Sequence, residues 1–157
     1  MFFNTESYNC AVDEKGRMLV PAKFRRDNEE LIDKGFYLKQ SSDFSCLELF
    51  PSETWFNYMG ILDKMGAFSK DVVAYKTKFL AYVKEVKLDK TNRILISKEL
   101  LTKCTIGKEI IMIPLTDRYQ IWDVAMYEKH IASLADVDFS DITGKLDEMF
   151  RENLKGN

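Results

Sequence analysis

Short apolar runs with the two-residue period of strands open the chain. Residues 8–12 and 17–20 flank a polar turn, and residues 36–39 and 47–50 flank a second turn around Ser42. Apolar runs separated by glycine, aspartate and serine are typical of strands joined by turns. The first fifty residues therefore predict two pairs of short strands.

The spacing of the apolar residues changes to a helical one after each pair of strands. Pro21 suits the first position of a short helix, because its missing N–H would have no partner there. A longer helix is predicted after Pro51, and a connecting helix over residues 69–81. One face of the longer helix would carry Trp55, Tyr58, Met59, Leu62 and Met65.

The second half of the chain repeats this order of elements. When the second half is shifted back by 76 positions, Asp89 aligns with Asp13 and Arg93 with Arg17. Further along the chain the offset decreases to 74 and then to 72. The predicted fold is α+β, a mostly β pseudo-twofold tandem repeat with flanking helices. Its predicted parts are a first half, a connecting helix, a second half and a helical tail, at residues 1–68, 69–81, 82–135 and 136–157.

The repeated feature is a turn with the pattern Asp-x-x-x-Arg. Gly16 can adopt the positive φ that a tight turn needs, and its counterpart Asn92 is the non-glycine residue that tolerates this region best. An aspartate can accept hydrogen bonds from the N–H groups of the turn and can hold the arginine guanidinium. Two interpretations remain open at this point: a stable hairpin closure, or an arginine held ready for phosphate or guanine.

The duplication favours the second interpretation, in which the arginines are held ready for phosphate or guanine. The net charge of the chain limits how such binding could arise. Lysines accompany both turns, Lys15 and Lys23 near the first and Lys90 in the second. The net charge of −2 is not that of a strongly basic nucleic-acid binder, so a basic surface must be local or multiplied by assembly. We expect Lys15, Arg17, Lys90 and Arg93 to point outward on one common face.

Other chemistry finds little support in the sequence. The three cysteines lie far apart, and His130 is the only histidine, so a zinc site, a disulfide framework and a catalytic histidine are not expected. No phosphate-binding loop or triad spacing indicates an enzyme. Apolar runs stay shorter than the ~18 residues of a spanning helix, which makes the cytoplasm the expected location.

The segments "MFFNTESYNCAVDEKGRMLVPAKFR" and "VKLDKTNRILISKEL" resemble the MraZ family, as do "CLELFP" and "DRYQIWD". That family carries two SpoVT-AbrB-type halves, each with a DxxxR signature, in a double AbrB/MazE-like swapped-hairpin fold. The resemblance implies a nucleoid-associated transcriptional regulator of the division and cell-wall gene cluster. It further implies rings that bind short repeats in the double-stranded DNA upstream of their own gene, without a cofactor, a small-molecule substrate or a membrane.

The DNA-binding residues expected from the resemblance and from the turns are Asp13, Lys15, Arg17, Lys23, Asp89, Lys90 and Arg93. The second copy departs from the family pattern. It has Asn92 where glycine is usual and Ser97 where proline is usual, so the two copies are not expected to contribute equally. An alternative is an antitoxin-like or scaffold protein, in which the hairpins mediate contacts between protein chains.

Overall fold

The computed structural model describes residues 5–156. The chain divides into two compact units, one up to Tyr127 and a smaller one from Glu128 onward, and each is described separately. None of the helices within the described residues has the length and apolar character needed to cross a membrane.

A six-stranded antiparallel sheet forms the centre of the first unit, and its strands come from the two halves of the chain in the order first, second, second, first, first, second. The strand order is β1-β7-β8-β4-β3-β5. Strand β1 of the first half pairs with β7, and β5 of the second half pairs with β3 in the equivalent way at the other edge. The bounds are β1 (Tyr8–Ala11), β3 (Phe36–Gln40), β4 (Leu47–Pro51), β5 (Lys84–Val86), β7 (Glu109–Pro114) and β8 (Tyr119–Asp123).

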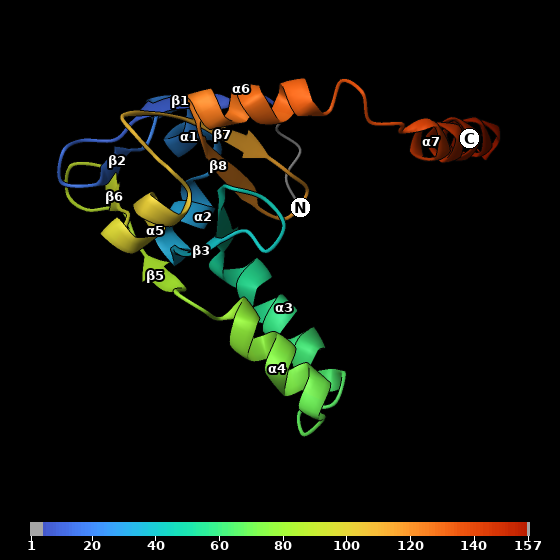
Figure 1. The fold of residues 1–157 in the computed structure, drawn as a ribbon, viewed down its shortest axis with the longest axis horizontal. Coiled ribbons are helices and arrows are strands. Elements are labelled where there is room, and N and C mark those ends of the chain that lie inside the picture. The colour runs from blue at the N-terminus through green and yellow to red at the C-terminus, as the bar shows by residue number, and fades with distance from the viewer. Residues whose placement is uncertain (1–4, 157) are drawn as a thin grey trace. The chain divides into compact units, whose positions relative to one another are not determined.

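A second, two-stranded ribbon joins β2 (Arg17–Leu19) to β6 (Arg93–Leu95). Figure 1 shows these strands side by side, although they lie in opposite halves of the sequence. The first turn is not closed into an ordinary hairpin, because β1 and β2 share only the isolated bridge between Val12 and Met18. Both halves instead exchange strands, which confirms the predicted pseudo-twofold fold.

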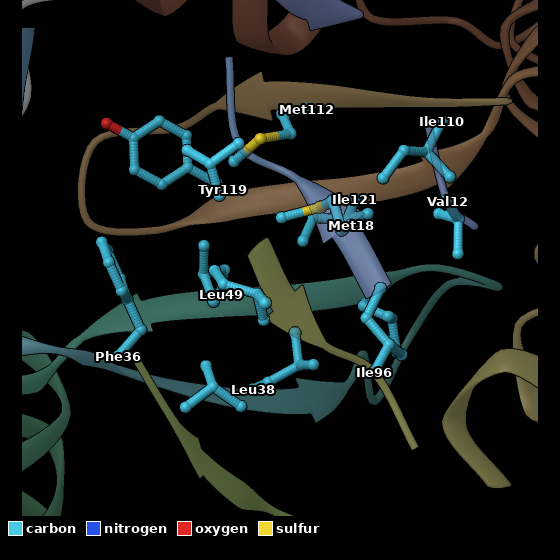
Figure 2. Close-up of a cluster of buried hydrophobic side chains, with 14 of the residues drawn as sticks. Val12, Met18, Phe36, Leu38, Leu49, Ile96, Ile110, Met112, Tyr119 and Ile121 are labelled. Carbon is cyan, nitrogen blue, oxygen red and sulfur yellow. The ribbon is translucent and has the colours of Figure 1, made fainter. Parts of the chain in front are cut away.

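The exchange is stabilised by one core to which both halves contribute. Met18 and Ile94, opposite each other in the ribbon, are almost completely buried. Figure 2 shows Met18 and Ile96 among side chains of the large sheet such as Leu38, Leu49 and Ile121. Separating the halves would expose this apolar surface to water, and its burial is the main driving force for the interleaved pairing.

Equivalent short helices follow the two ribbon strands. These are α1 (Ala22–Asp27) and α5 (Lys98–Lys103), and α2 (Glu29–Lys34) extends the first. Phe24 of α1 and Leu100 of α5 are fully buried at the same repeat offset. Pro21 lies just before α1 and not at its first helical position, and Ser97 holds the same place before α5. The Ser97 hydroxyl accepts a hydrogen bond from the Leu100 N–H at 3.3 Å, so serine replaces proline as a functional helix start.

Helices α3 (Ser52–Lys64) and α4 (Lys70–Phe79) pack side by side in the first unit (Figure 1). Trp55 stacks on Phe79 with ring centroids 5.4 Å apart, and Phe50 completes this small second core. The predicted apolar face of α3 is confirmed at Trp55 and Leu62, whereas Met65 is 68% exposed. Met65 instead lines an apolar groove of about 420 Å³ between α3 and α4, with Tyr58, Met59, Ile61, Leu62, Val72 and Tyr75.

Helix α6 (Val124–Ser133) follows the last strand, and the Asp123 side chain accepts a hydrogen bond from the Met126 N–H at 3.2 Å, as a capping aspartate should. The smaller unit contains α7 (Ser140–Lys155), which lies in the predicted helical tail. One stripe of α7 is apolar and exposed, at Ile142, Leu146, Met149, Phe150 and Leu154.

Candidate nucleic-acid interface

The first Asp-x-x-x-Arg turn is a closed network around one carboxylate. The Asp13 N–H donates to the Arg17 carbonyl at 2.9 Å, and the Gly16 N–H donates to the Asp13 carbonyl at 3.0 Å. Asp13 Oδ1 accepts from the N–H groups of Lys15 and Arg17, each at 2.9 Å. These bonds to the ionised form lower the pKa of Asp13, the N–H of Arg17 most of all. The aspartate therefore remains charged at neutral pH.

The same carboxylate fixes the arginine that follows the turn. Arg17 Nε donates to Asp13 Oδ2 at 2.8 Å, in an ion pair whose side chains are 35% and 31% exposed. Within residues 5–156 the two η-nitrogens of Arg17 have no hydrogen-bond partner. One edge of the guanidinium is thus anchored, while donors remain that a phosphate or a guanine could accept from.

The second turn has the same backbone. The Asp89 N–H donates to the Arg93 carbonyl at 2.9 Å, and the Asn92 N–H donates to the Asp89 carbonyl at 3.0 Å. Asn92 has a φ of 62° and Gly16 a φ of 81°, so both occupy the left-handed region as predicted. The duplication therefore preserves the turn itself despite the change of residue.

The side chains of the second turn are connected differently. Asp89 Oδ1 accepts from the N–H and the hydroxyl of Thr91, both at 2.8 Å, and from the N–H of Arg93 at 3.0 Å. The backbone N–H of Arg93 is the main reason for the lowered pKa of Asp89. The hypothesis that Asp89 holds the guanidinium of Arg93 is wrong, since Arg93 Nη1 lies 3.6 Å from Asp13 Oδ2. Strand exchange brings Arg93 to the first turn, and Thr91 takes the place of a guanidinium at Asp89.

Each turn is also fastened by the other half of the chain. The Ile96 N–H donates to the Gly16 carbonyl at 2.8 Å, and the Val20 N–H donates to the Asn92 carbonyl at 3.0 Å. A Cβ atom at position 16 would lie 2.8 Å from the carbonyl oxygen of Ile96. Glycine is therefore needed there both for its positive φ and for this close approach.

The predicted site residues do not all come together. Asp13, Arg17 and Arg93 form one cluster, and Lys15, Asp89 and Lys90 are exposed on the two turns. Lys23 lies on α1, where its ammonium is paired with the carboxylate of Glu6. This exposed ion pair would have to open for Lys23 to contact a phosphate.

The sequence interpretation missed two features. Thr91 was not recognised as the partner of Asp89, although a threonine two residues after an aspartate is a signal of such a turn. The second missed feature is a buried charged cluster. Arg118 donates to Glu48 and to the Tyr58 hydroxyl, each at 2.8 Å. Lys39 Nζ lies 3.6 Å from the Glu48 carboxylate. The available signal was a charged residue inside the apolar strand "CLELF".

The buried cluster is saturated by its own members. The Arg118 guanidinium also lies over the Phe50 ring at 4.8 Å and donates to Asp117 at 3.0 Å. Burial lowers the pKa of Lys39, and the carboxylate of Glu48 opposes that shift. The cluster connects the second half to the first. Its charged groups are occupied by one another, so none of them is available for catalysis.

Metal and thiol chemistry have no prepared site in the described part of the chain. No group of three or more His, Cys, Asp or Glu side chains is arranged to hold a metal ion among residues 5–156. Burial raises the pKa of the Cys46 thiol to about 12 and that of Cys104 to about 11, which keeps both protonated and unreactive near neutral pH.

Comparison with known proteins agrees with the duplicated architecture. A family model described as "MraZ protein, putative antitoxin-like" matches residues 1–74 and 79–150, one segment for each half. The chain belongs to the MraZ family. A protein of Christiangramia forsetii named transcriptional regulator MraZ is 34% identical over 136 residues, which cover 87% of each chain. A protein of Thermoanaerobacter sp. with the same name is 36% identical over 142 residues, covering 90% of this chain and 95% of its own.

The MraZ family match includes both Asp-x-x-x-Arg turns and extends to Phe150. It therefore also includes most of the apolar stripe of α7. The resemblance to MraZ proposed from the motifs is confirmed by these comparisons.

Proposed function

We propose that this member of the MraZ family is a DNA-binding transcriptional regulator and not an enzyme. The observation that carries the proposal is the convergence of Arg17 and Arg93 on Asp13, with the η-nitrogens of Arg17 left as donors. A guanidinium fixed at one edge recognises phosphate or guanine at a lower entropic cost than a freely rotating one. The names of the relatives, transcriptional regulator MraZ, support the same function.

The residues have separate roles in this proposal. Arg17 and Arg93 contact the duplex directly, and Asp13 positions them without touching DNA. Lys15 and Lys90, exposed on the turns, neutralise phosphates. Asp89 keeps the second turn in shape, and Lys23 joins the interface after leaving Glu6. No cofactor or small-molecule substrate takes part.

The finer biological assignment rests on the family resemblance. We propose that the bound DNA consists of short repeats upstream of the protein's own gene, in the division and cell-wall gene cluster. The protein would then act in the cytoplasm at the nucleoid. The domain limits predicted at residues 68, 81 and 135 stay predictions.

Self-association into a ring is the remaining part of the proposal. A chain with a net charge of −2 gains little from non-specific attraction to DNA, whereas several copies on adjacent repeats gain effective concentration. Two exposed apolar surfaces are available for such contacts, the groove between α3 and α4 and the stripe on α7. Contiguous exposed apolar surface is typical of association sites.

A variant of α7 tests the assembly. Leu146→Lys places a charge in the apolar stripe, and Glu148→Lys on the polar face of the same helix is the control. We expect the first variant to lower the particle mass in solution and to bind repeated DNA no better than a single repeat. The second should keep the wild-type mass. If Leu146→Lys assembles normally, α7 is not part of the ring contact.

A gel-shift titration with the DNA upstream of the protein's own gene tests the binding site. Arg17→Ala and Arg93→Ala should each weaken binding, by roughly 5- to 100-fold for a direct arginine contact, while the particle mass is unchanged. Arg151→Ala removes an exposed arginine of α7 and should bind as the wild type does. Unchanged shifts in both turn variants would contradict the site assignment.

The family description includes the words "antitoxin-like", and this supports one alternative function, in which the turns bind other protein chains. If the turns mediate contacts between chains, Arg17→Ala and Arg93→Ala will reduce the particle mass. The same titration with a mass measurement on each variant therefore separates the two functions.

A further inference from the structure

The outer face of the β2–β6 ribbon carries two exposed leucines, one from each half. Leu19 is 47% exposed and Leu95 is 62% exposed. Side chains alternate between the faces of a strand, and the residues between these leucines and the arginines, Met18 and Ile94, point into the core. Leu19 and Leu95 therefore lie on the same outward face as the two arginines.

The register of the ribbon places each leucine directly opposite an arginine. Leu19 pairs with Arg93, and Leu95 pairs with Arg17. The two pairs are related by the pseudo-twofold symmetry of the chain, so the face presents the order arginine–leucine twice, in opposite directions. A single exposed leucine on a protein surface is unremarkable. Two leucines at equivalent positions, each beside a proposed DNA contact, need an explanation.

We propose that Leu19 and Leu95 read thymine in the major groove of the duplex that the arginines bind. The major groove of B-DNA admits a two-stranded ribbon, and the C5-methyl group of thymine is the apolar feature exposed there. Arginine pairs with guanine or phosphate in the same groove, so each cross-strand pair would combine one polar and one apolar contact. The inference rests on the proposed DNA-binding function and adds a source of sequence preference to it.

The charged groups around the leucines favour DNA over a protein partner. Lys15, Arg17, Lys90 and Arg93 lie in the two turns or directly after them, and Asp13 and Asp89 are occupied by internal hydrogen bonds. The exposed acids nearby are Glu14 in the first turn and Glu109, which lines a shallow hollow with Leu19. An apolar protein surface docked on the leucines would bury the two arginine guanidiniums without phosphates to compensate them, which is costly. A duplex supplies both the phosphates and the methyl groups.

Replacing thymine by uracil removes only the methyl group, and this gives a direct test. The probe is the duplex upstream of the protein's own gene, prepared once with thymine and once with uracil throughout the segment that the protein protects. Wild-type protein should bind the uracil duplex about fourfold more weakly for each methyl group contacted, hence roughly 15-fold for two. Equal binding to the two duplexes would overturn the proposal without any variant being needed.

Variants locate the effect on the leucines. The Leu19→Ala/Leu95→Ala protein should bind the thymine duplex about 15-fold more weakly than the wild type, and substitution by uracil should then make little further difference. Leu115→Ala, at an exposed leucine in the turn between β7 and β8, should keep the full thymine preference. A double variant that still prefers the thymine duplex would overturn the assignment, whether or not its particle mass changes.

The same titrations keep this inference separate from the proposed function. Arg17→Ala should lose affinity for both duplexes, which tests DNA binding by the turns. If Arg17→Ala weakens binding while wild-type protein ignores the methyl groups, the proposed function holds and the reading of thymine is wrong. If wild-type protein binds neither duplex, both are wrong.

Discussion

The two halves of the chain share one backbone design but not one set of charged contacts. In the first turn Asp13 holds the guanidinium of Arg17 and attracts that of Arg93, whereas Asp89 in the second turn is bonded to Thr91. The buried cluster joins Lys39 and Glu48 of the first half to Arg118 of the second, and it is not repeated at the equivalent positions. At the repeat offsets of 74 and 72, Lys39 and Glu48 of the first half correspond to Ile113 and Gln120 of the second. The backbone turn and its left-handed residue have been kept in both halves, while the ionic contacts have not been duplicated.

The helices that follow the two halves also differ, in how much of their apolar surface is buried. Helix α4 packs on α3 and buries Phe79, while α7 of the smaller unit exposes its apolar stripe. Tertiary packing supplies most of the stability of a helix, so a well-formed amphipathic helix with an exposed stripe indicates a partner surface. Burial of Phe79 stabilises α4 within the first unit, whereas the stripe of α7 is a surface that the proposed assembly would use.

The largest expected effect comes from breaking the buried cluster at Glu48. Glu48→Ala leaves Lys39, whose side chain is 3% exposed, without its carboxylate partner. Removal of one partner of a buried pair costs about 3–5 kcal/mol of unfolding free energy. The equivalent Gln120→Ala loses a hydrogen bond from Trp122 and should cost about 1 kcal/mol. Urea denaturation measures both values, and equal losses would contradict the unequal roles of positions 48 and 120.

The next effect separates the two arginines. Lysine keeps the charge but lacks the planar fork that lets Arg17 bond Asp13 through Nε and present its η-nitrogens at the same time. Arg17→Lys should therefore weaken DNA binding about 10-fold and Arg93→Lys about threefold, in titrations at one fixed salt concentration. Should the two variants lose affinity equally, the anchoring by Asp13 has no functional role.

The smallest effect is on stability in acid. The pKa values of Asp13 and Asp89 are lower in the folded protein than in the unfolded chain, because backbone N–H groups bond the ionised forms. Their stabilisation is present above the unfolded pKa of about 3.9 and is lost as pH falls through the lower folded values. Thermal melts from pH 6 downward should show a smaller acid-induced drop for Asp13→Asn and for Asp89→Asn than for the wild type. Identical pH profiles for the wild type and both variants would show that neither aspartate contributes to the loss of stability in acid.

Much of the fold was predictable because its signals are local. Strand runs, the helix after Pro51 and the positive-φ residues Gly16 and Asn92 all follow from residue type and spacing. The partner of Arg93 was not predictable from spacing, because it depends on which strands pair across the halves. The outward leucines were missed for a related reason: only the ribbon register shows that they stand beside the arginines. The buried cluster joins Lys39, Glu48 and Arg118 from distant parts of the sequence, and a single charged residue in a strand could not reveal it.

The central claim is that both turns face DNA, and lysine reactivity measures this most directly. The protein is treated with an amine-acetylating reagent with and without the duplex from upstream of its own gene, and each lysine is quantified by mass spectrometry. Lys15 and Lys90, both exposed in the free protein, should become several-fold less reactive with DNA, while Lys64 on α3 and Lys155 on α7 serve as internal references and should not change. Unchanged reactivity of Lys15 and Lys90 in a complex that demonstrably forms, or protection confined to the reference lysines, would contradict the claim.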